Sequence, residues 1–165
     1  IDVKNLSIED ASFPEESFDV ITLWNVLDHL CNPMQTLKFA QRLLKKGGLL
    51  IARVPNVHFH LFIHKIYPLI GFCGNYCFIK DPSLVVNYGF SRRTLYEMTQ
   101  RAGFQRICIY NSPLSQGDPY QSFKAIHEYI IDIIKSCYFV SAELISSITF
   151  GRTLISSSIL AYATK

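Results

Sequence analysis

Two stretches of the chain, residues 18–24 and 49–54, are apolar and rich in β-branched side chains, with no clean alternation of polar positions. Strands that are covered on both faces have this pattern, because neither face meets water. Between them, Asn32 can cap a helix that begins at Pro33, and apolar residues then recur at helical spacing (Met34, Leu37, Ala40, Leu44). The glycines at 47–48 can end that helix in the left-handed conformation. The pattern predicts two parallel strands joined by a right-handed helical crossover.

The second half of the chain continues the alternation of helices and strands. We expect a helix over residues 92–102 and a strand over 104–110. Another helix begins at Pro119, and because a single helix over the whole apolar stretch that follows would be unusually long, we expect a break near Ser141. A last strand covers residues 156–164. This order predicts an α/β domain.

Two segments are too long to be simple connections between these elements. Residues 55–87 are rich in aromatic residues, glycine and histidine, and a connection of this length usually serves a function or forms a lid. Residues 112–155 make a second, largely helical insertion before the last strand. We therefore expect one domain over residues 1–165, with a cap at 55–87 and a helical insertion at 112–155.

Composition and charge indicate which classes of binding partner and which cellular location to expect. The 165 residues carry a formal net charge of +3 without a run of basic residues, so we expect no nucleic-acid partner. The five cysteines include no Cys-x-x-Cys pair, which indicates reduced thiols and a cytoplasmic location, and we expect Cys108 to be buried in a strand. Charged residues interrupt the apolar stretches 58–79 and 129–150, so we expect no transmembrane span, whereas peripheral membrane contact stays open. The sequence does not indicate an oligomeric state.

Several segments stand in an order that points to a family. They are residues 13–21, Asn25 to His29, the Leu44-Lys45-Lys46-Gly47-Gly48 turn, residues 88–104 and residues 158–165. Together they resemble the class I S-adenosylmethionine-dependent methyltransferases, in particular the small-molecule branch. The resemblance implies a Rossmann-like methyltransferase sheet whose last strand runs antiparallel beside 104–110. It also implies S-adenosyl-L-methionine as cofactor and a small-molecule acceptor.

One part of the family pattern is missing from this chain. The family binds its cofactor through a Gly-x-Gly loop, and the chain contains no such sequence. The chain also begins at Ile1. We therefore expect a fold that is incomplete at its N-terminus, and a fragment that is inactive alone.

The resemblance implies positions for the cofactor. Ser7 and Ile8 would flank the adenine, although this loop can equally be a solvated polar turn. Leu23, Trp24 and Asn25 end a predicted strand, where the family's cofactor places its methionine part. Trp24 could instead fill the core beside the helix that begins at Pro33.

Asp28 and His29 form the most reactive pair in the sequence. A histidine can take a proton from a hydroxyl or amine as it attacks a methyl group, and a nearby carboxylate can orient the ring. The alternative is that both residues begin the polar cap before the helix. The Asn25-x-x-Asp28-His29 spacing also resembles a Glu-x-x-Glu-His metal pattern, but Asn25 replaces the first carboxylate, so we expect no metal.

For the acceptor we expect a small, apolar or aromatic molecule. The substrate-binding candidates, Asn56, His58, Phe72, Tyr76 and Tyr88, belong to or follow the predicted cap, after the carboxyl end of a strand where open α/β sheets bind ligands. A zinc site built from the histidines and cysteines of the cap (His58, His60, His64, Cys73 and Cys77) is a weaker alternative because the spacing is loose. A different class of function also stays open, a non-enzymatic binding or assembly module on a degenerate methyltransferase fold.

Overall fold

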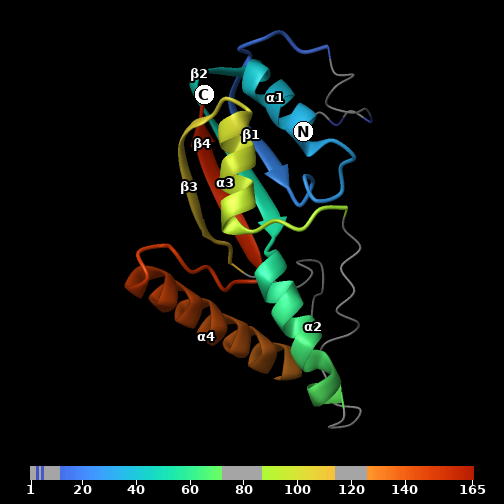
Figure 1. Ribbon diagram of the computed structural model, residues 1–165, viewed down its shortest axis with the longest axis vertical. Coiled ribbons are helices and arrows are strands. Elements are labelled where there is room, and N and C mark those ends of the chain that lie inside the picture. Colours follow the sequence, from blue (N-terminus) through green and yellow to red (C-terminus); the bar gives the residue numbers. More distant parts are fainter. Residues whose placement is uncertain (1–2, 4, 6–11, 72–86, 114–125) are drawn as a thin grey trace.

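The computed structural model describes residues 3, 5, 12–71, 87–113 and 126–165. Its elements are β1 (Phe18–Trp24), α1 (Pro33–Leu43), β2 (Leu44–Pro55), α2 (Val57–Gly71), α3 (Arg92–Arg101), β3 (Gln105–Asn111), α4 (Ile126–Ile148) and β4 (Ser158–Thr164). The strands form a sheet in the order β1-β2-β4-β3. In Figure 1, α1 and α3 lie in front of this sheet, and α2 and α4 lie beyond its lower end.

The strand directions confirm the predicted fold class. β1 and β2 are parallel, and their paired positions end with Trp24 opposite Arg53. β4 is antiparallel to both of its neighbours, β2 and β3. The sheet is therefore a mixed, open α/β sheet of the Rossmann-like kind, with the last strand inserted antiparallel beside β3, as expected.

Local sequence signals explain where the two helices over the sheet begin. The Asn32 side chain accepts a hydrogen bond from the backbone N–H of Gln35 over 3.2 Å, with Pro33 at the first helical position. Ser91 and Thr94 form a capping box at the start of α3, in which each side chain bonds the other residue's backbone N–H. These caps satisfy backbone donors that the first helical turn leaves without partners.

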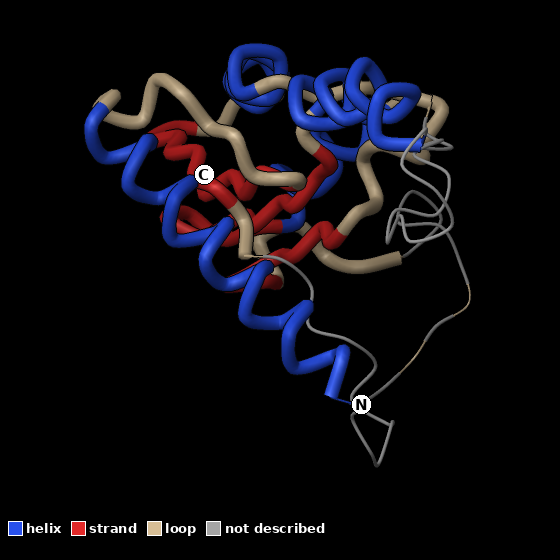
Figure 2. Tube along the Cα trace, turned by 90° about the horizontal axis from the view of Figure 1, so that it is seen from below, coloured by secondary structure: helices blue, strands red, loops and turns tan. Residues whose placement is uncertain are grey.

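The two faces of the sheet differ in how well they are covered. The core lies on the face under α1 and α3 and includes fully buried Leu37, Leu50 and Leu95. On the opposite face, Val20, Trp24 and Tyr110 keep about half of their surface exposed. Figure 2 shows helices gathered on one side of the strands and one long helix running past the other side. The described residues thus bury one face of the sheet and leave much of the other open.

Three expectations need correction. α1 ends at Leu43 and β2 begins at once with Leu44, earlier than predicted, although Gly47 does adopt the left-handed conformation with φ of 78°. α4 continues through Ser141 without a break, because that hydroxyl donates to the Cys137 carbonyl one turn earlier, over 2.8 Å. Cys108 lies in β3 but is exposed, since it belongs to the open face of the sheet.

The first half of the predicted cap is helical, since α2 occupies Val57–Gly71, and residues 72–86 lie outside the described residues. Among the helices that the structure describes, none is long and apolar enough to cross a membrane.

Candidate functional site

The carboxyl ends of β1 and β2 meet at one edge of the sheet, where open α/β sheets bind their ligands. Asn25 follows β1 with φ of 53°, a left-handed conformation that few residues other than glycine adopt, and its N–H donates to the Arg53 carbonyl over 2.9 Å. Trp24 is 54% exposed, so the alternative that it fills the core is wrong. Leu23 is buried in the core, so a ligand at this edge could meet only its backbone.

Arg53 is a residue of this edge that the sequence pattern did not reveal. It is buried, and its Nε donates to Ser112 Oγ over 2.8 Å. Its guanidinium carbon lies 5.4 Å from the centre of the Trp24 ring, a cation–π distance. Burial lowers the pKa of the Arg53 guanidinium below its usual value. The contact fixes the orientation of the exposed Trp24 ring from the neighbouring strand.

Asp28 and His29 lie in the loop that follows β1. Asp28 is 1% exposed, and neither carboxylate oxygen accepts a hydrogen bond from any residue that the structure describes. Its Oδ2 lies 3.2 Å from Nε2 of His29, whose side chain is 58% exposed. Asn32 caps α1, as expected, and the Asp28 carboxylate accepts no backbone N–H of the described residues, so it does not satisfy donors of the polar segment before this helix. The loop thus joins a buried carboxylate to a solvent-accessible imidazole.

The segment at Asn87 and Tyr88 holds this loop in place. The backbone N–H groups of Asn87 and Tyr88 both donate to the Asp28 carbonyl, over 2.8 and 3.2 Å. The Asn87 side chain donates to the His29 carbonyl over 2.7 Å, and the Tyr88 hydroxyl donates to the Cys31 carbonyl over 2.9 Å. Tyr88, predicted to bind substrate, therefore also supports the loop that carries Asp28 and His29, and Asn87 is a support that the sequence did not single out.

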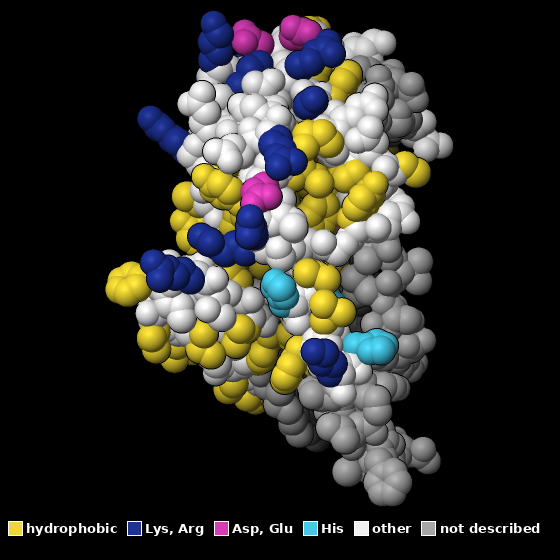
Figure 3. Space-filling view, viewed as in Figure 1, with side chains coloured by type: hydrophobic (Ala, Val, Ile, Leu, Met, Phe, Trp, Pro, Cys, Tyr) yellow, Lys and Arg dark blue, Asp and Glu magenta, His cyan; other side chains and the backbone are white. Residues whose placement is uncertain are grey.

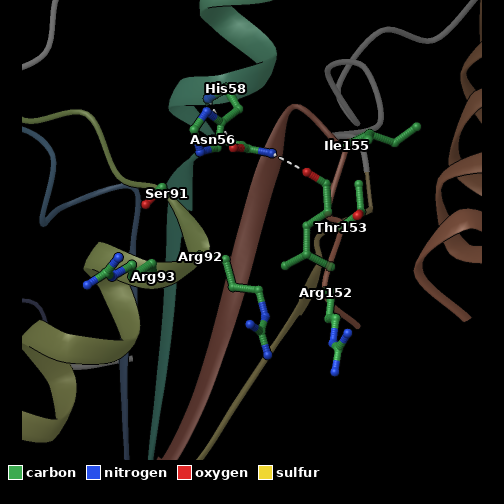
Figure 4. Close-up of a pocket in the computed structure, with 9 residues that line it drawn as sticks. Asn56, His58, Ser91, Arg92, Arg93, Arg152, Thr153 and Ile155 are labelled. Carbon is green, nitrogen blue, oxygen red and sulfur yellow. Dashed lines mark hydrogen bonds between the residues drawn. The ribbon is translucent and has the colours of Figure 1, made fainter. Parts of the chain in front are cut away.

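Asn56 follows β2 and is almost completely buried, with 1% of its surface exposed. Its side-chain N–H groups donate to the Leu154 carbonyl over 3.0 Å (Figure 4) and to the Ser156 carbonyl over 2.9 Å, and its Oδ1 accepts from the His58 N–H over 3.2 Å. These three hydrogen bonds of the side-chain amide are all made to backbone groups of the protein. Asn56 therefore joins the end of β2 to the segment before β4.

The histidines of α2 have separate surroundings. Nε2 of His60 lies 3.2 Å from the Ser157 carbonyl, and burial lowers the pKa of His60, an effect that this hydrogen bond partly opposes. His58 and His64 are exposed. Within the described residues, no group of three or more potential metal ligands gathers.

Some predicted site residues cannot be placed. Ser7 and Ile8 of the cofactor set, Phe72 and Tyr76 of the substrate set, and Cys73 and Cys77 of the zinc alternative lie outside the described residues. The structure thus brings together, at one edge of the sheet, Trp24, Asn25, Asp28, His29 and Tyr88. An exposed imidazole beside a buried carboxylate can accept and release a proton at such an edge.

Comparison with known proteins assigns the chain to a family. A family model described as a methyltransferase domain matches residues 1–109. Ubiquinone biosynthesis O-methyltransferase from Cereibacter sphaeroides is 36% identical over 56 residues, which are 34% of this chain and 23% of that protein. The chain therefore spans less than a quarter of this curated relative.

Solved structures agree on the fold. A SAM-dependent methyltransferase from Thermotoga maritima matches 96% of this chain and 61% of its own, with a TM-score of 0.56 and 19% identity. One from Archaeoglobus fulgidus matches 99% of this chain and 66% of its own, with a TM-score of 0.56 and 16% identity. At such identities the likeness establishes the fold alone. With the family model covering most of its length, the chain belongs to the methyltransferase-domain family, whose cofactor is S-adenosylmethionine.

Proposed function

We propose that the protein transfers a methyl group from S-adenosylmethionine to a small molecule, with His29 as general base and Asp28 as the residue that positions it. The observation that carries this proposal is the contact of 3.2 Å between the buried Asp28 carboxylate and the exposed His29 ring, directly after β1. Family membership supplies the reaction class, and the pair supplies a route for the proton.

The charge of Asp28 at this edge of the sheet is opposite to that of the methyl donor. When bound, S-adenosylmethionine supplies an electrophilic methyl group on a positively charged sulfur. A buried carboxylate that accepts no hydrogen bond from the described residues, as in Asp28, suits a positively charged neighbour. Exposed Trp24 and Asn25 would hold the methionine part of the cofactor. Ser7 and Ile8 remain the proposed adenine contacts.

The proposed role of His29 follows from which ring nitrogen is occupied. Nε2 lies 3.2 Å from the Asp28 carboxylate, within ion-pair distance although without hydrogen-bond geometry, so Nδ1 is the nitrogen that we propose accepts the proton. As the acceptor's oxygen or nitrogen forms its bond to the methyl carbon and the carbon–sulfur bond breaks, the acceptor's proton passes to His29. Asp28 stabilises the imidazolium that results. In-line positioning of the acceptor supplies the rest of the rate enhancement.

For the acceptor we keep the expectation of a small, apolar or aromatic molecule. Tyr88 supports it, because this residue combines an exposed ring, at 40% of its surface, with a hydroxyl fixed on the Cys31 carbonyl. His58 is exposed at the start of α2, which belongs to the proposed cap at 55–87. Phe72 and Tyr76 stay proposed members of this set.

Substitution of His29 in the protein that carries this chain tests the proposal. We expect His29→Ala to lower kcat by about a hundredfold, because the proton would lose its acceptor, while cofactor affinity changes less than about twofold. Asp28→Asn should lower kcat less, and the double variant should be no slower than His29→Ala, since Asp28 acts through His29. His64→Ala, an exposed histidine on α2, is the matched control. A loss of less than threefold in His29→Ala would exclude His29 as the base.

We also retain the proposal that the 165-residue chain is inactive by itself. The support is the missing Gly-x-Gly sequence, which leaves the cofactor's methionine and ribose without their usual backbone contacts. Calorimetric titration with S-adenosylmethionine should detect weak binding or none. A micromolar dissociation constant, equivalent to about 8 kcal/mol, would contradict this proposal.

A further inference from the structure

A concave site lies beside the N-terminus of α3, and we propose that it binds the phosphate group of a small phosphate monoester. The cavity has a volume of about 370 Å³ and is lined by the start of α2, the start of α3 and residues 152–155. Among the residues that the structure describes, its charged lining residues are Arg92, Arg93 and Arg152, and no acidic one lines it. Figure 3 shows Lys and Arg side chains gathered over this part of the surface, where α3 begins near one end of α4.

Two of the arginines line this cavity from different segments of the chain. In Figure 4 the side chains of Arg92 and Arg152 extend in the same direction, although they come from segments far apart in the sequence. Within the part of the chain that the structure describes, neither guanidinium has a carboxylate partner. Two unpaired guanidinium groups on one cavity repel each other unless an anion lies between them, so the pair favours a ligand with negative charge.

Arg93 differs from its neighbour and provides an internal comparison. Its side chain points away from the cavity in Figure 4, and its Nε donates to Glu97 over 2.8 Å. Arg93 contributes its backbone to the cavity, while its charge is already neutralised by an exposed ion pair. The cationic character of the site therefore comes from Arg92 and Arg152.

The beginning of α3 adds polar donors to the same space. Ser91 uses its hydroxyl oxygen to accept the Thr94 N–H, and the first turn contains no acidic side chain. The N–H groups of Arg92 and Arg93, the first two helical positions, have no acceptor within the helix, because its hydrogen bonds begin later. These donors and the positive end of the helix dipole reinforce the two guanidinium groups.

Charge and size together select the ligand class. Two guanidinium groups match the double negative charge of a phosphate monoester better than the single charge of a carboxylate, and each can bind two phosphate oxygens at once. A cavity of about 370 Å³ has the size of a small-molecule site and exceeds the needs of a bare ion. We therefore infer a small organic phosphate whose remaining part contacts the lining segment 153–155.

Nuclear magnetic resonance with inorganic phosphate as probe tests this site directly. Titration of the ¹⁵N-labelled chain should shift the backbone amide signals of Arg92 and Arg93 saturably. Sodium acetate at equal ionic strength should shift them less. We expect Arg92→Gln and Arg152→Gln each to weaken phosphate binding about tenfold or more, because each removes a charge-assisted bond. Arg93→Gln removes the same formal charge from the neighbouring position and should change affinity less than twofold.

The phosphate could belong to a soluble metabolite or to a lipid, and a second arm separates these sources. Exposed apolar residues of α4, including Leu144 and Ile148, precede Arg152 in the chain, so a lipid headgroup offers the same chemistry. Co-sedimentation with phosphatidylcholine vesicles, with and without phosphatidic acid, should show binding dependent on Arg92 and Arg152 only if the source is a lipid.

The site is absent if the Arg92 and Arg93 amides do not move with phosphate and no vesicle binding depends on Arg92 or Arg152. An equal loss of affinity in Arg93→Gln would also overturn the proposal, since it would show attraction by net charge alone. Circular dichroism melting of each variant verifies its fold. Because the test needs neither S-adenosylmethionine nor a methyl acceptor, its failure would leave the proposed methyl transfer untouched.

Discussion

Substitution of Asn56 tests how strongly its side chain joins the end of β2 to the segment before β4. The amide was a substrate-binding candidate, yet its side-chain N–H groups bond the Leu154 and Ser156 carbonyls and its oxygen accepts the His58 N–H. These carbonyls lie about 100 residues away in the chain, at the entrance to β4. Asn56→Ala removes three neutral hydrogen bonds, at about 1 kcal/mol each, and leaves two buried carbonyl acceptors and the His58 N–H without these partners.

From these contributions we expect Asn56→Ala to lower the free energy of unfolding by about 2–4 kcal/mol. For a domain of this size the melting temperature should fall by about 5–15 °C. Asn56→Asp should cost more at neutral pH, because it turns a negative oxygen toward two carbonyl oxygens. Urea unfolding followed by circular dichroism measures both variants, and Gln100→Ala, an exposed amide on α3, is the control. A loss below about 1 kcal/mol for Asn56→Ala would refute the structural role.

Three further substitutions test the core, a close backbone contact and a half-buried histidine. Leu37→Ala empties a fully buried position and should cost about 2–5 kcal/mol in urea unfolding; a cost under 1 kcal/mol would mean that Leu37 is outside the core. Gly48→Ala would place a Cβ 2.9 Å from the Lys45 carbonyl oxygen, so its melting temperature should fall by several degrees, and an unchanged value would contradict this packing. Because burial lowers the pKa of His60, the unfolded chain binds its proton more readily, and stability should fall as pH drops below about 6.5. His60→Gln should flatten this pH dependence of stability, and an unchanged slope would assign it to other groups.

The parts of the fold that the sequence predicted are those with local causes. Asn32, Pro33 and Ser91 identify the starts of α1 and α3 because a cap involves residues only three positions apart. The antiparallel last strand came from the family resemblance, since neighbouring residues do not determine strand order. The predicted break at Ser141 is wrong because a serine hydroxyl can bond the carbonyl one turn earlier and leave the helix intact.

The candidate site was predicted where its residues are chemically distinctive and missed where they depend on distant partners. Asp28 and His29 stand out as adjacent titratable residues after a strand. Arg53 does not, since its role depends on Trp24 of the neighbouring strand and on Ser112, 59 positions away. The structural contacts of Asn56 were missed for the same reason. The sequence indicated substrate binding, and only the folded chain brings the Leu154 and Ser156 carbonyls to its side chain.

The buried carboxylate of Asp28 leads to a last prediction, in which stability and function oppose each other. Neither of its oxygens accepts a hydrogen bond from the described residues. Among these residues, only the neighbouring His29 therefore offsets the free-energy cost of burying a negative charge. Asn has the same shape without the charge. We therefore expect Asp28→Asn to keep the melting temperature or to raise it by about 2 °C or more.

The two measurements on Asp28→Asn must be read together. A residue retained for packing loses stability when it is changed, whereas one retained for chemistry loses turnover and spares or gains stability. A fall of the melting temperature by more than about 4 °C would show that the carboxylate has a structural partner and would remove the main support for its role beside His29. A raised melting temperature together with reduced turnover would show that the fold tolerates an unfavourable buried charge because the proton transfer requires it.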